Sequence, residues 1–257
     1  MSQLSIYAAR ESGLHKLNPV TKFVLTLFLL VLGLGLPGMW ASYSVLILLI
    51  IPLAIWGKVA GRLARIVLNI SWPFILSVFI IQTLFWGRGT PLFELGLISP
   101  KLEGAIFAFT STGRILLVMS DFILFSLATR PDILMISLKQ GGLHPGMAYI
   151  IVTTLQLIPQ FAAKANSILN AQRSRGLETQ GNLFVRTRAL LPLILPLVIG
   201  SLMEVEERAI AIEARAFNSK HKETSLIEIP DSRLQRTIRA GMILLALLAM
   251  ARRFLWQ

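Results

Sequence analysis

Two arginines of this 257-residue chain stand in the same local pattern, 40 positions apart. Arg175 lies in Ala171-Gln172-Arg173-Ser174-Arg175-Gly176, and Arg215 lies in Ala211-Ile212-Glu213-Ala214-Arg215-Ala216. Small residues flank each arginine, so its guanidinium stands clear of bulky neighbours. A guanidinium carries five N–H donors in a rigid fork, which suits a carboxylate or a set of backbone carbonyls on another surface. The pattern therefore predicts two arginine tips that point away from the membrane and can reach another surface.

Two long helices must carry these tips, and the hydrophobic pattern predicts them over 147–175 and 190–217. A purely structural interpretation is also open, because cations are favoured at helix C-termini and Gly176 is an ordinary residue just past a helix end. Small residues recur along both helices, at a spacing that lets two helices cross closely. They are Ala162, Ala163, Ser167 and Ala171 on the first helix, and Ala209, Ala211, Ala214 and Ala216 on the second.

The composition indicates an all-α, polytopic membrane protein. Hydrophobic residues make up 54% of the chain, whereas apolar residues, with Gly counted, make up roughly 45–50% of soluble chains. The mean hydropathy of the chain is +0.69. The net charge of +12 favours Lys and Arg on cytoplasmic loops and against anionic lipid headgroups. Nucleic acid is not an expected partner, because the basic residues flank apolar spans. The absence of cysteine excludes disulfides and thiolate metal sites.

About five transmembrane helices are expected, over 20–36, 41–56, 66–86, 105–127 and a last span from 240 onward. Asn18-Pro19 predicts the start of the first, with Lys22 snorkelling to its cytoplasmic end. Residues 57–65 form a predicted loop with three cations and no acid, which places the N-terminus in the cytoplasm. Pro73 predicts a kink in the third span, and residues 219–239 are expected to form a cytoplasmic loop.

The predicted organisation has three parts: N-terminal transmembrane helices over 1–128, a cytoplasmic module with the two long helices over 129–235, and a C-terminal transmembrane helix over 236–257. Thr129 is the expected N-cap of a short helix over 133–139, with Asp132 completing a capping box. A basic segment with Arg186 and Arg188 joins the long helices. Glu204 and Arg208 form an expected i,i+4 pair.

The sequence contains few residues that could take part in catalysis or ion transport. Arg114 and Asp121 lie inside the fourth span, where charges are functional candidates by default. Seven positions apart on one helix face, they are expected to neutralise each other or to satisfy a neighbouring helix. No phosphate-binding loop is present, and His15, His144 and His221 have no second metal ligand nearby in sequence. No catalytic residue, metal site or cofactor bound by this chain is predicted.

Longer motifs resemble the transmembrane T component of energy-coupling factor (ECF) transporters, of EcfT, CbiQ or BioN type. They are His15-Lys16-Leu17-Asn18-Pro19-Val20-Thr21-Lys22, Ser126-Leu127-Ala128-Thr129-Arg130-Pro131, Leu157-Ile158-Pro159, Ala171-Gln172-Arg173-Ser174-Arg175-Gly176 and Glu213-Ala214-Arg215-Ala216-Phe217. The resemblance covers most of the chain. Ser174 stands where the family commonly has Ala, and Ala216 where it commonly has Gly.

The resemblance implies a non-catalytic coupling subunit in a prokaryotic cell membrane, with its N-terminus and both coupling helices on the cytoplasmic side. The implied partners are two ABC ATPases, which use the ATP, and a small hydrophobic S component that binds a vitamin or metal ion. The implied ATPase-docking residues are Ser174, Arg175, Gly176, Ala214, Arg215 and Ala216, supported by Arg173 and Glu213.

Three other functions are possible for a membrane protein of this composition. An ion-driven secondary transporter would use Arg114 and Asp121 and would need no ATP. A membrane enzyme of lipid chemistry would need an acidic or His cluster near one interface, and none is visible. A conventional ABC importer permease would also need ATPases, but it would couple through one short cytoplasmic helix.

Overall fold

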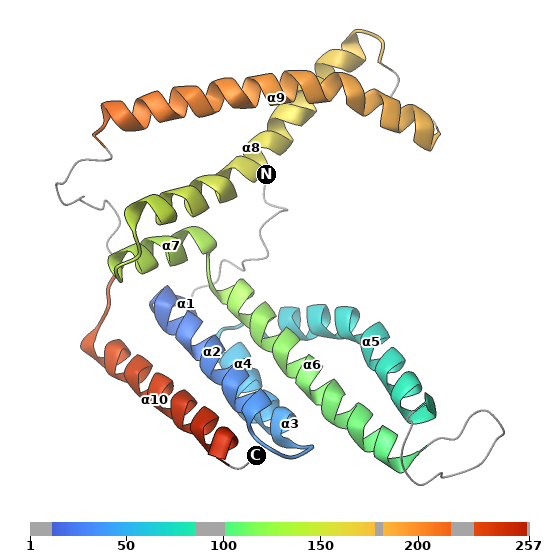
Figure 1. Ribbon diagram of the computed structural model, residues 1–257, viewed down its shortest axis with the longest axis vertical. Coiled ribbons are helices and arrows are strands. Elements are labelled where there is room, and N and C mark those ends of the chain that lie inside the picture. Colours follow the sequence, from blue (N-terminus) through green and yellow to red (C-terminus); the bar gives the residue numbers. More distant parts are fainter. Residues whose placement is uncertain (1–11, 86–100, 178–181, 217–228, 256–257) are drawn as a thin grey trace. The chain divides into compact units, whose positions relative to one another are not determined.

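The computed structural model describes residues 12–85, 101–177, 182–216 and 229–255, and every element in these ranges is helical (Figure 1). This confirms the predicted all-α class. The helices are α1 (Gly13–Lys16), α2 (Pro19–Gly35), α3 (Ala41–Val45), the π-helical turn η1 (Leu46–Ile50), α4 (Ile51–Trp56), α5 (Ala60–Phe85), α6 (Leu102–Ala128), α7 (Pro131–Gln140), α8 (Pro145–Ser174), α9 (Leu183–Ala214) and α10 (Arg233–Leu255).

The chain divides into two compact units. Unit 1 comprises residues 1–142 and 229–257, and unit 2 comprises residues 143–228. Unit 1 therefore holds α1 to α7 together with α10, and unit 2 holds α8 and α9. The three functional parts predicted from the sequence, with boundaries at 128/129 and 235/236, stay a prediction.

Four helices are long and apolar enough to cross a membrane, and two shorter apolar segments accompany them. The four are Ala60–Phe85, Leu102–Ala128, Gly146–Ser174 and Arg233–Arg252, and the shorter segments are Pro19–Gly35 and Ala41–Trp56. Many large apolar side chains of α5 and α10 are exposed on the protein itself. Such surfaces are stable against lipid tails, so the chain is a multi-pass membrane protein.

The first helical hairpin follows the sequence prediction. The Asn18 side chain accepts a hydrogen bond from the Val20 N–H (2.9 Å) and so caps α2, with Pro19 at its first position. The chain leaves α2 at Leu36 and turns through Gly38, whose φ of +113° suits glycine. It then returns through α3, η1 and α4 as one continuous helical run.

The predicted loop over 57–65 is wrong for most of its length, because α5 already begins at Ala60. Lys58, at φ +55°, makes the turn, and Arg62 and Arg65 lie in the first turns of α5. Pro73 lies inside α5, and Figure 1 shows this helix changing direction along its length, as expected for an internal proline.

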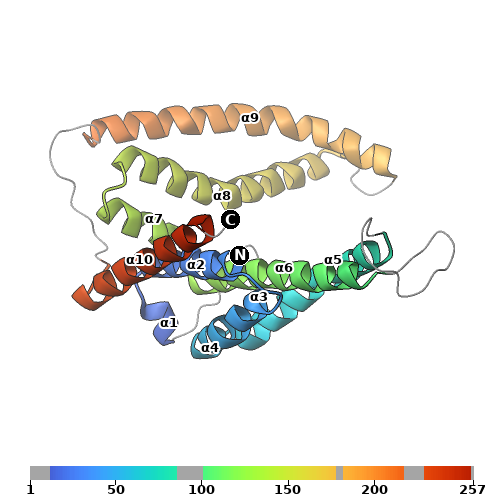
Figure 2. The same cartoon turned by 60° about the horizontal axis from the view of Figure 1, so that its bottom comes forward.

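The core of unit 1 lies where α2, the α3–α4 run and α5 meet α6. Its fully buried side chains include Leu29, Ile50, Leu117 and Leu127. Gly33 gives α2 its close approach to α6, because a Cβ at this position would collide with the Leu117 side chain. Helix α10 packs along α2, and Figures 1 and 2 both show the two side by side.

Three helix starts differ from the prediction. The N-cap of α7 is Arg130, not Thr129, and it makes no side-chain cap bond. Thr129 instead ends α6, and its buried hydroxyl has no hydrogen-bond partner among the residues that the structure describes. Asp132 pairs with Arg130 (2.7 Å) rather than with the helix start. Residues 183–189 belong to α9, with Pro192 and Pro196 inside it, and residues 233–239 form the first turns of α10.

Candidate functional site: two helix ends and their crossing

The first arginine tip is formed by the C-terminal end of α8. Arg175 is the C-cap, with φ −91° and ψ 10°, and Gly176 follows in the left-handed region at φ +88°. The Gly176 N–H donates to the Arg173 carbonyl (3.0 Å) and the Leu177 N–H to the Gln172 carbonyl (3.0 Å). This pair of bonds is the Schellman arrangement, which satisfies helix-end carbonyls and turns the chain away.

The second tip, at the end of α9, shares one of these bonds and the left-handed residue. The Arg215 N–H donates to the Ala211 carbonyl (3.3 Å), and the Ala216 N–H donates to the Glu213 carbonyl (2.9 Å). Ala216 has a φ of +55°, so an alanine occupies the left-handed position that Gly176 fills on α8. Arg173 and Glu213 are thus equivalent, since each offers its carbonyl to the left-handed residue.

Both guanidiniums are available to a partner. Arg175 and Arg215 are exposed, and within the described residues neither side chain makes a hydrogen bond or ion pair. Ser174, whose hydroxyl donates to the Asn170 carbonyl (3.2 Å), and Ala214 are exposed as well. The arrangement supplies two fixed forks of N–H donors that an acidic or carbonyl-rich groove could accept.

Helices α8 and α9 contact each other, as predicted, but not through the residues expected (Figure 1). Ala162, Ala163, Ser167, Ala171, Ala209, Ala211, Ala214 and Ala216 are all exposed. Polar side chains join the two helices. Lys164 Nζ lies 3.6 Å from Glu204 Oε2, and Arg208 Nη2 donates to Gln160 Oε1 (2.7 Å) and to Glu204 Oε1 (2.6 Å). The predicted Glu204–Arg208 pair is therefore confirmed.

Sequence reasoning missed Lys164 as a partner of Glu204, although a signal was available. Lys164 and Glu204 are 40 positions apart, as are Arg175 and Arg215.

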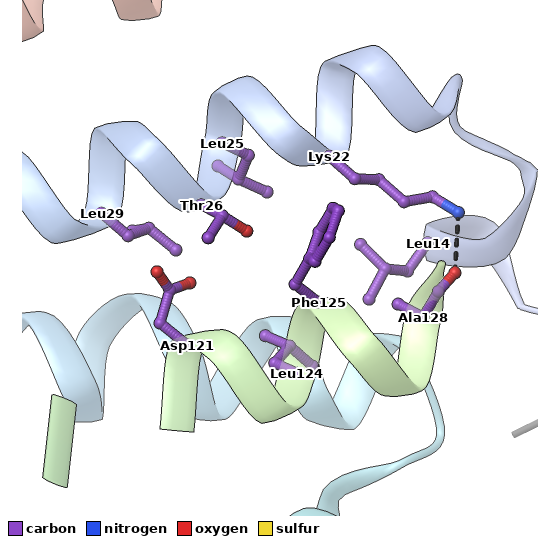
Figure 3. Close-up of a pocket in the computed structure, with 9 residues that line it drawn as sticks. All are labelled: Leu14, Lys22, Leu25, Thr26, Leu29, Asp121, Leu124, Phe125 and Ala128. Carbon is purple, nitrogen blue, oxygen red and sulfur yellow. Dashed lines mark hydrogen bonds between the residues drawn. The ribbon is translucent and has the colours of Figure 1, made fainter. Parts of the chain in front are cut away.

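The predicted snorkelling of Lys22 to the cytoplasmic end of its helix is wrong. Lys22 is buried, and its ammonium donates to the carbonyl of Ala128 (2.9 Å; Figure 3) and to that of His15 (3.1 Å). Nearby, Gln235 of α10 accepts from the Asn18 N–H (3.0 Å) and from the Thr21 hydroxyl (3.3 Å). The motif at 15–22 therefore joins α1, α2, α6 and α10 at one end of unit 1.

Arg114 and Asp121 do not neutralise each other. Arg114 is exposed, Asp121 is buried, and no ion pair joins them. Asp121 Oδ2 has no hydrogen-bond partner among the described residues. The carboxylate lies beside Leu29 and Thr26 at the rim of a small cavity of about 20 Å³ between α2 and α6 (Figure 3). The two residues on which the secondary-transport alternative rests are therefore not joined to each other.

Among the described residues, no group of three or more His, Asp or Glu side chains could hold a metal ion. His221 lies outside the described residues. The expected absence of a metal site or bound cofactor stays a prediction.

All-α architecture, apolar helices of bilayer length and two long helices with exposed arginine ends define the class of multi-pass membrane proteins. The family model described as CbiQ, cobalt transport protein, matches residues 10–226. The chain belongs to this family of membrane transport proteins.

Relatives of known name agree with the family. An energy-coupling factor transporter transmembrane protein EcfT of Acidaminococcus fermentans is 27% identical, over 98% of this chain and 96% of the relative. The protein of the same name from Lacticaseibacillus paracasei is 26% identical, over 94% and 95%. That from Exiguobacterium sibiricum is 32% identical, over 60% and 62%.

Proposed function

We propose that this chain is the transmembrane coupling subunit of an ATP-driven importer of ECF type, which takes up a vitamin or a metal ion. Two ABC ATPases bind the tips at Arg175 and Arg215, and a small hydrophobic S component binds the substrate. The observation that carries this proposal is the shared geometry of the two tips. Each has an exposed C-cap arginine followed by a left-handed residue, so two equivalent subunits can dock in the same way.

The mechanism uses α8 and α9 as rigid transmitters. When ATP closes the ATPase pair, the two tips move relative to each other, and the helices carry this movement to the S component. ATP is bound by the ATPases and not by this chain. The N-terminus and both tips then lie on the cytoplasmic side, where ATP is available, which agrees with the cations at the start of α5.

Each docked guanidinium has to stay paired while its ATPase moves. Removing one partner of a buried charged contact costs about 3–5 kcal/mol. A cost of this size weakens binding by about a hundredfold or more. The residues around each arginine serve the same contact. Gly176 and Ala216 turn the chain away, and Ser174 and Ala214 leave room for the walls of a groove.

The test co-expresses the chain with the ATPases and the small membrane protein whose genes neighbour its own. Arg175→Ala and Arg215→Ala should each lower the ATPase recovered with the purified chain, and the double variant should lose both ATPases. Uptake of the vitamin or metal ion bound by the co-purified S component should stop in the double variant. Arg62→Ala, an exposed arginine of unit 1, is the matched control. Normal ATPase recovery and uptake in the double variant would disprove the proposal.

A further inference from the structure

Four polar side chains join α8 and α9, namely Gln160, Lys164, Glu204 and Arg208, which we call the crossing cluster. Glu204 is its centre, since its carboxylate pairs with Arg208 on its own helix and with Lys164 on the other. Arg208 also reaches across to Gln160 (2.7 Å). The charged members are about one third exposed, at 34% for Lys164, 29% for Glu204 and 31% for Arg208. Such partial shielding from water strengthens ion pairs relative to fully exposed ones.

Gly200 belongs to the same contact. A Cβ at this position would lie 2.9 Å from Lys164 Nζ and 3.0 Å from its Cε. The Lys164 side chain therefore lies directly against the α9 backbone one turn before Glu204. Hydrogen bonds and ion pairs depend on direction and distance, so these contacts define one register between the helices more sharply than apolar contacts would.

The Lys164–Glu204 contact, at the centre of the crossing cluster, lies at the same distance from both tips. Lys164 precedes Arg175 by 11 residues, and Glu204 precedes Arg215 by 11 residues. We call the helix segment from the crossing residue to the arginine an arm. At 1.5 Å per residue each arm is about 16 Å long. Eleven residues are also close to three full helical turns, so each arginine leaves its helix near the face that carries the crossing residue.

We propose that the crossing cluster is the pivot of the two coupling helices, about which α8 and α9 turn without sliding. Lys164, Glu204, Arg208 and Gln160 act as positioning residues, and the equal arms make the two tips move by equal amounts. A turn of 10° at the pivot displaces each tip by about 3 Å. The inference rests on the proposed function, because the ATPases drive the movement.

Rotation about a pivot predicts a gradient of movement along the arms. The exposed pair Ser167 and Glu207 lies three residues beyond Lys164 and Glu204, and the exposed pair Ala171 and Ala211 lies seven residues beyond. The separation across a pair should change in proportion to its distance from the pivot. Sliding or rigid translation of one helix would instead change both separations alike.

The experiment uses the whole complex, reconstituted in lipid, with spin labels on introduced cysteine pairs. This chain has no cysteine, so within it labels enter only at Ser167→Cys with Glu207→Cys, or at Ala171→Cys with Ala211→Cys, and the partner subunits are used in cysteine-free form. Pulsed electron–electron distances are measured without nucleotide and with ATP and vanadate. The change at 171/211 should be about twice the change at 167/207. Equal changes at both pairs would overturn the pivot.

A second measurement uses a variant in which the Glu204 carboxylate is replaced by an amide of nearly the same shape. Glu204→Gln should abolish the gradient and lower transport per ATP hydrolysed by about fivefold or more, the effect of losing one coupled contact. Glu206→Gln, an exposed glutamate on the same helix, is the matched control and should behave like the parent. A Glu204→Gln variant with an unchanged gradient and transport ratio would contradict the inference.

The two proposals fail in different ways. If ATPases do not co-purify, or if neither label pair responds to nucleotide, the proposed coupling function fails and the pivot fails with it. If the pairs respond equally, or if Glu204→Gln matches Glu206→Gln, the coupling function stands and the pivot is wrong. The label measurements on the otherwise unchanged chain decide the matter even if Glu204→Gln does not fold.

Discussion

The ammonium of Lys22 on α2 lies 2.9 Å from the carbonyl oxygen of Ala128, the last residue of α6. It also donates to the carbonyl of His15, in α1 (3.1 Å). Carbonyls at a helix C-terminus have no partner within their helix and carry partial negative charge. A single buried cation therefore satisfies two helix ends and holds three helices together (Figure 3).

Lys22→Met should destabilise unit 1. The substitution keeps the aliphatic length of the side chain but leaves the Ala128 carbonyl without its donor, and a buried unsatisfied group costs about 1–3 kcal/mol. We expect the free energy of unfolding, measured with denaturant in detergent micelles, to fall by about 2 kcal/mol. Lys16→Met, at an exposed lysine of the adjacent α1, serves as the control. Equal stability of the two variants would show that the Lys22 contacts contribute nothing.

Exchanging Gly and Ala at the two tips should have opposite effects. Gly176→Ala places a Cβ at φ +88°, with no atom of the described residues within 4 Å of it, so we expect a backbone cost of about 1 kcal/mol. Ala216→Gly relieves the same strain at φ +55° and should stabilise the end of α9 by about 0.5 kcal/mol. Amide hydrogen exchange over 170–177 should become faster in the first variant, and exchange over 210–216 slower in the second. Shifts in the same direction would refute this account.

The start of α10 should be sensitive to acid through Asp231. Burial raises the pKa of this carboxyl, but hydrogen bonds from Arg236 (2.9 Å) and Arg239 (2.6 and 2.7 Å) outweigh it, so the pKa lies below its ordinary value of 3.8. Because the folded pKa is the lower one, the stabilisation is complete above the ordinary value and is lost as the pH falls through the folded pKa.

Asp231→Asn should remove this acid-dependent part of the unfolding free energy and lower stability at neutral pH by about 1 kcal/mol. Arg239→Gln should cost more than Arg236→Gln, because the Arg239 side chain is 16% exposed and that of Arg236 is 67% exposed. Unfolding followed at pH 3 to 7 checks both statements. A pH dependence that persists in Asp231→Asn would mean that another group is responsible.

Features set by near neighbours in the chain were predictable. Asn18 caps α2 through an amide two positions away, and Glu204 meets Arg208 one helical turn along α9. The chain turns at Gly176 because the residue after the C-cap is left-handed. Each depends on local backbone geometry, which residue type and spacing largely determine.

Helix starts were less predictable where charged residues precede an apolar run. Arg62 and Arg65, and residues 233–239, were expected in loops and lie in helices. Hydropathy marks the part of a helix that lipid or core covers, whereas Arg and Lys have high intrinsic helix propensity. The helices therefore extend beyond their apolar segments into polar surroundings.

The amino-acid sequence alone determined the all-α membrane class, the family resemblance and the two arginine ends, because these depend on composition and on patterns within one helix. Only the tertiary structure decided which distant groups meet. Lys22 reaches a carbonyl 106 positions away, Asp121 is buried without Arg114, and Lys164 crosses to Glu204. Such contacts follow from the way helices pack, and the number of possible partners for one charged side chain is too large for spacing alone to select among them.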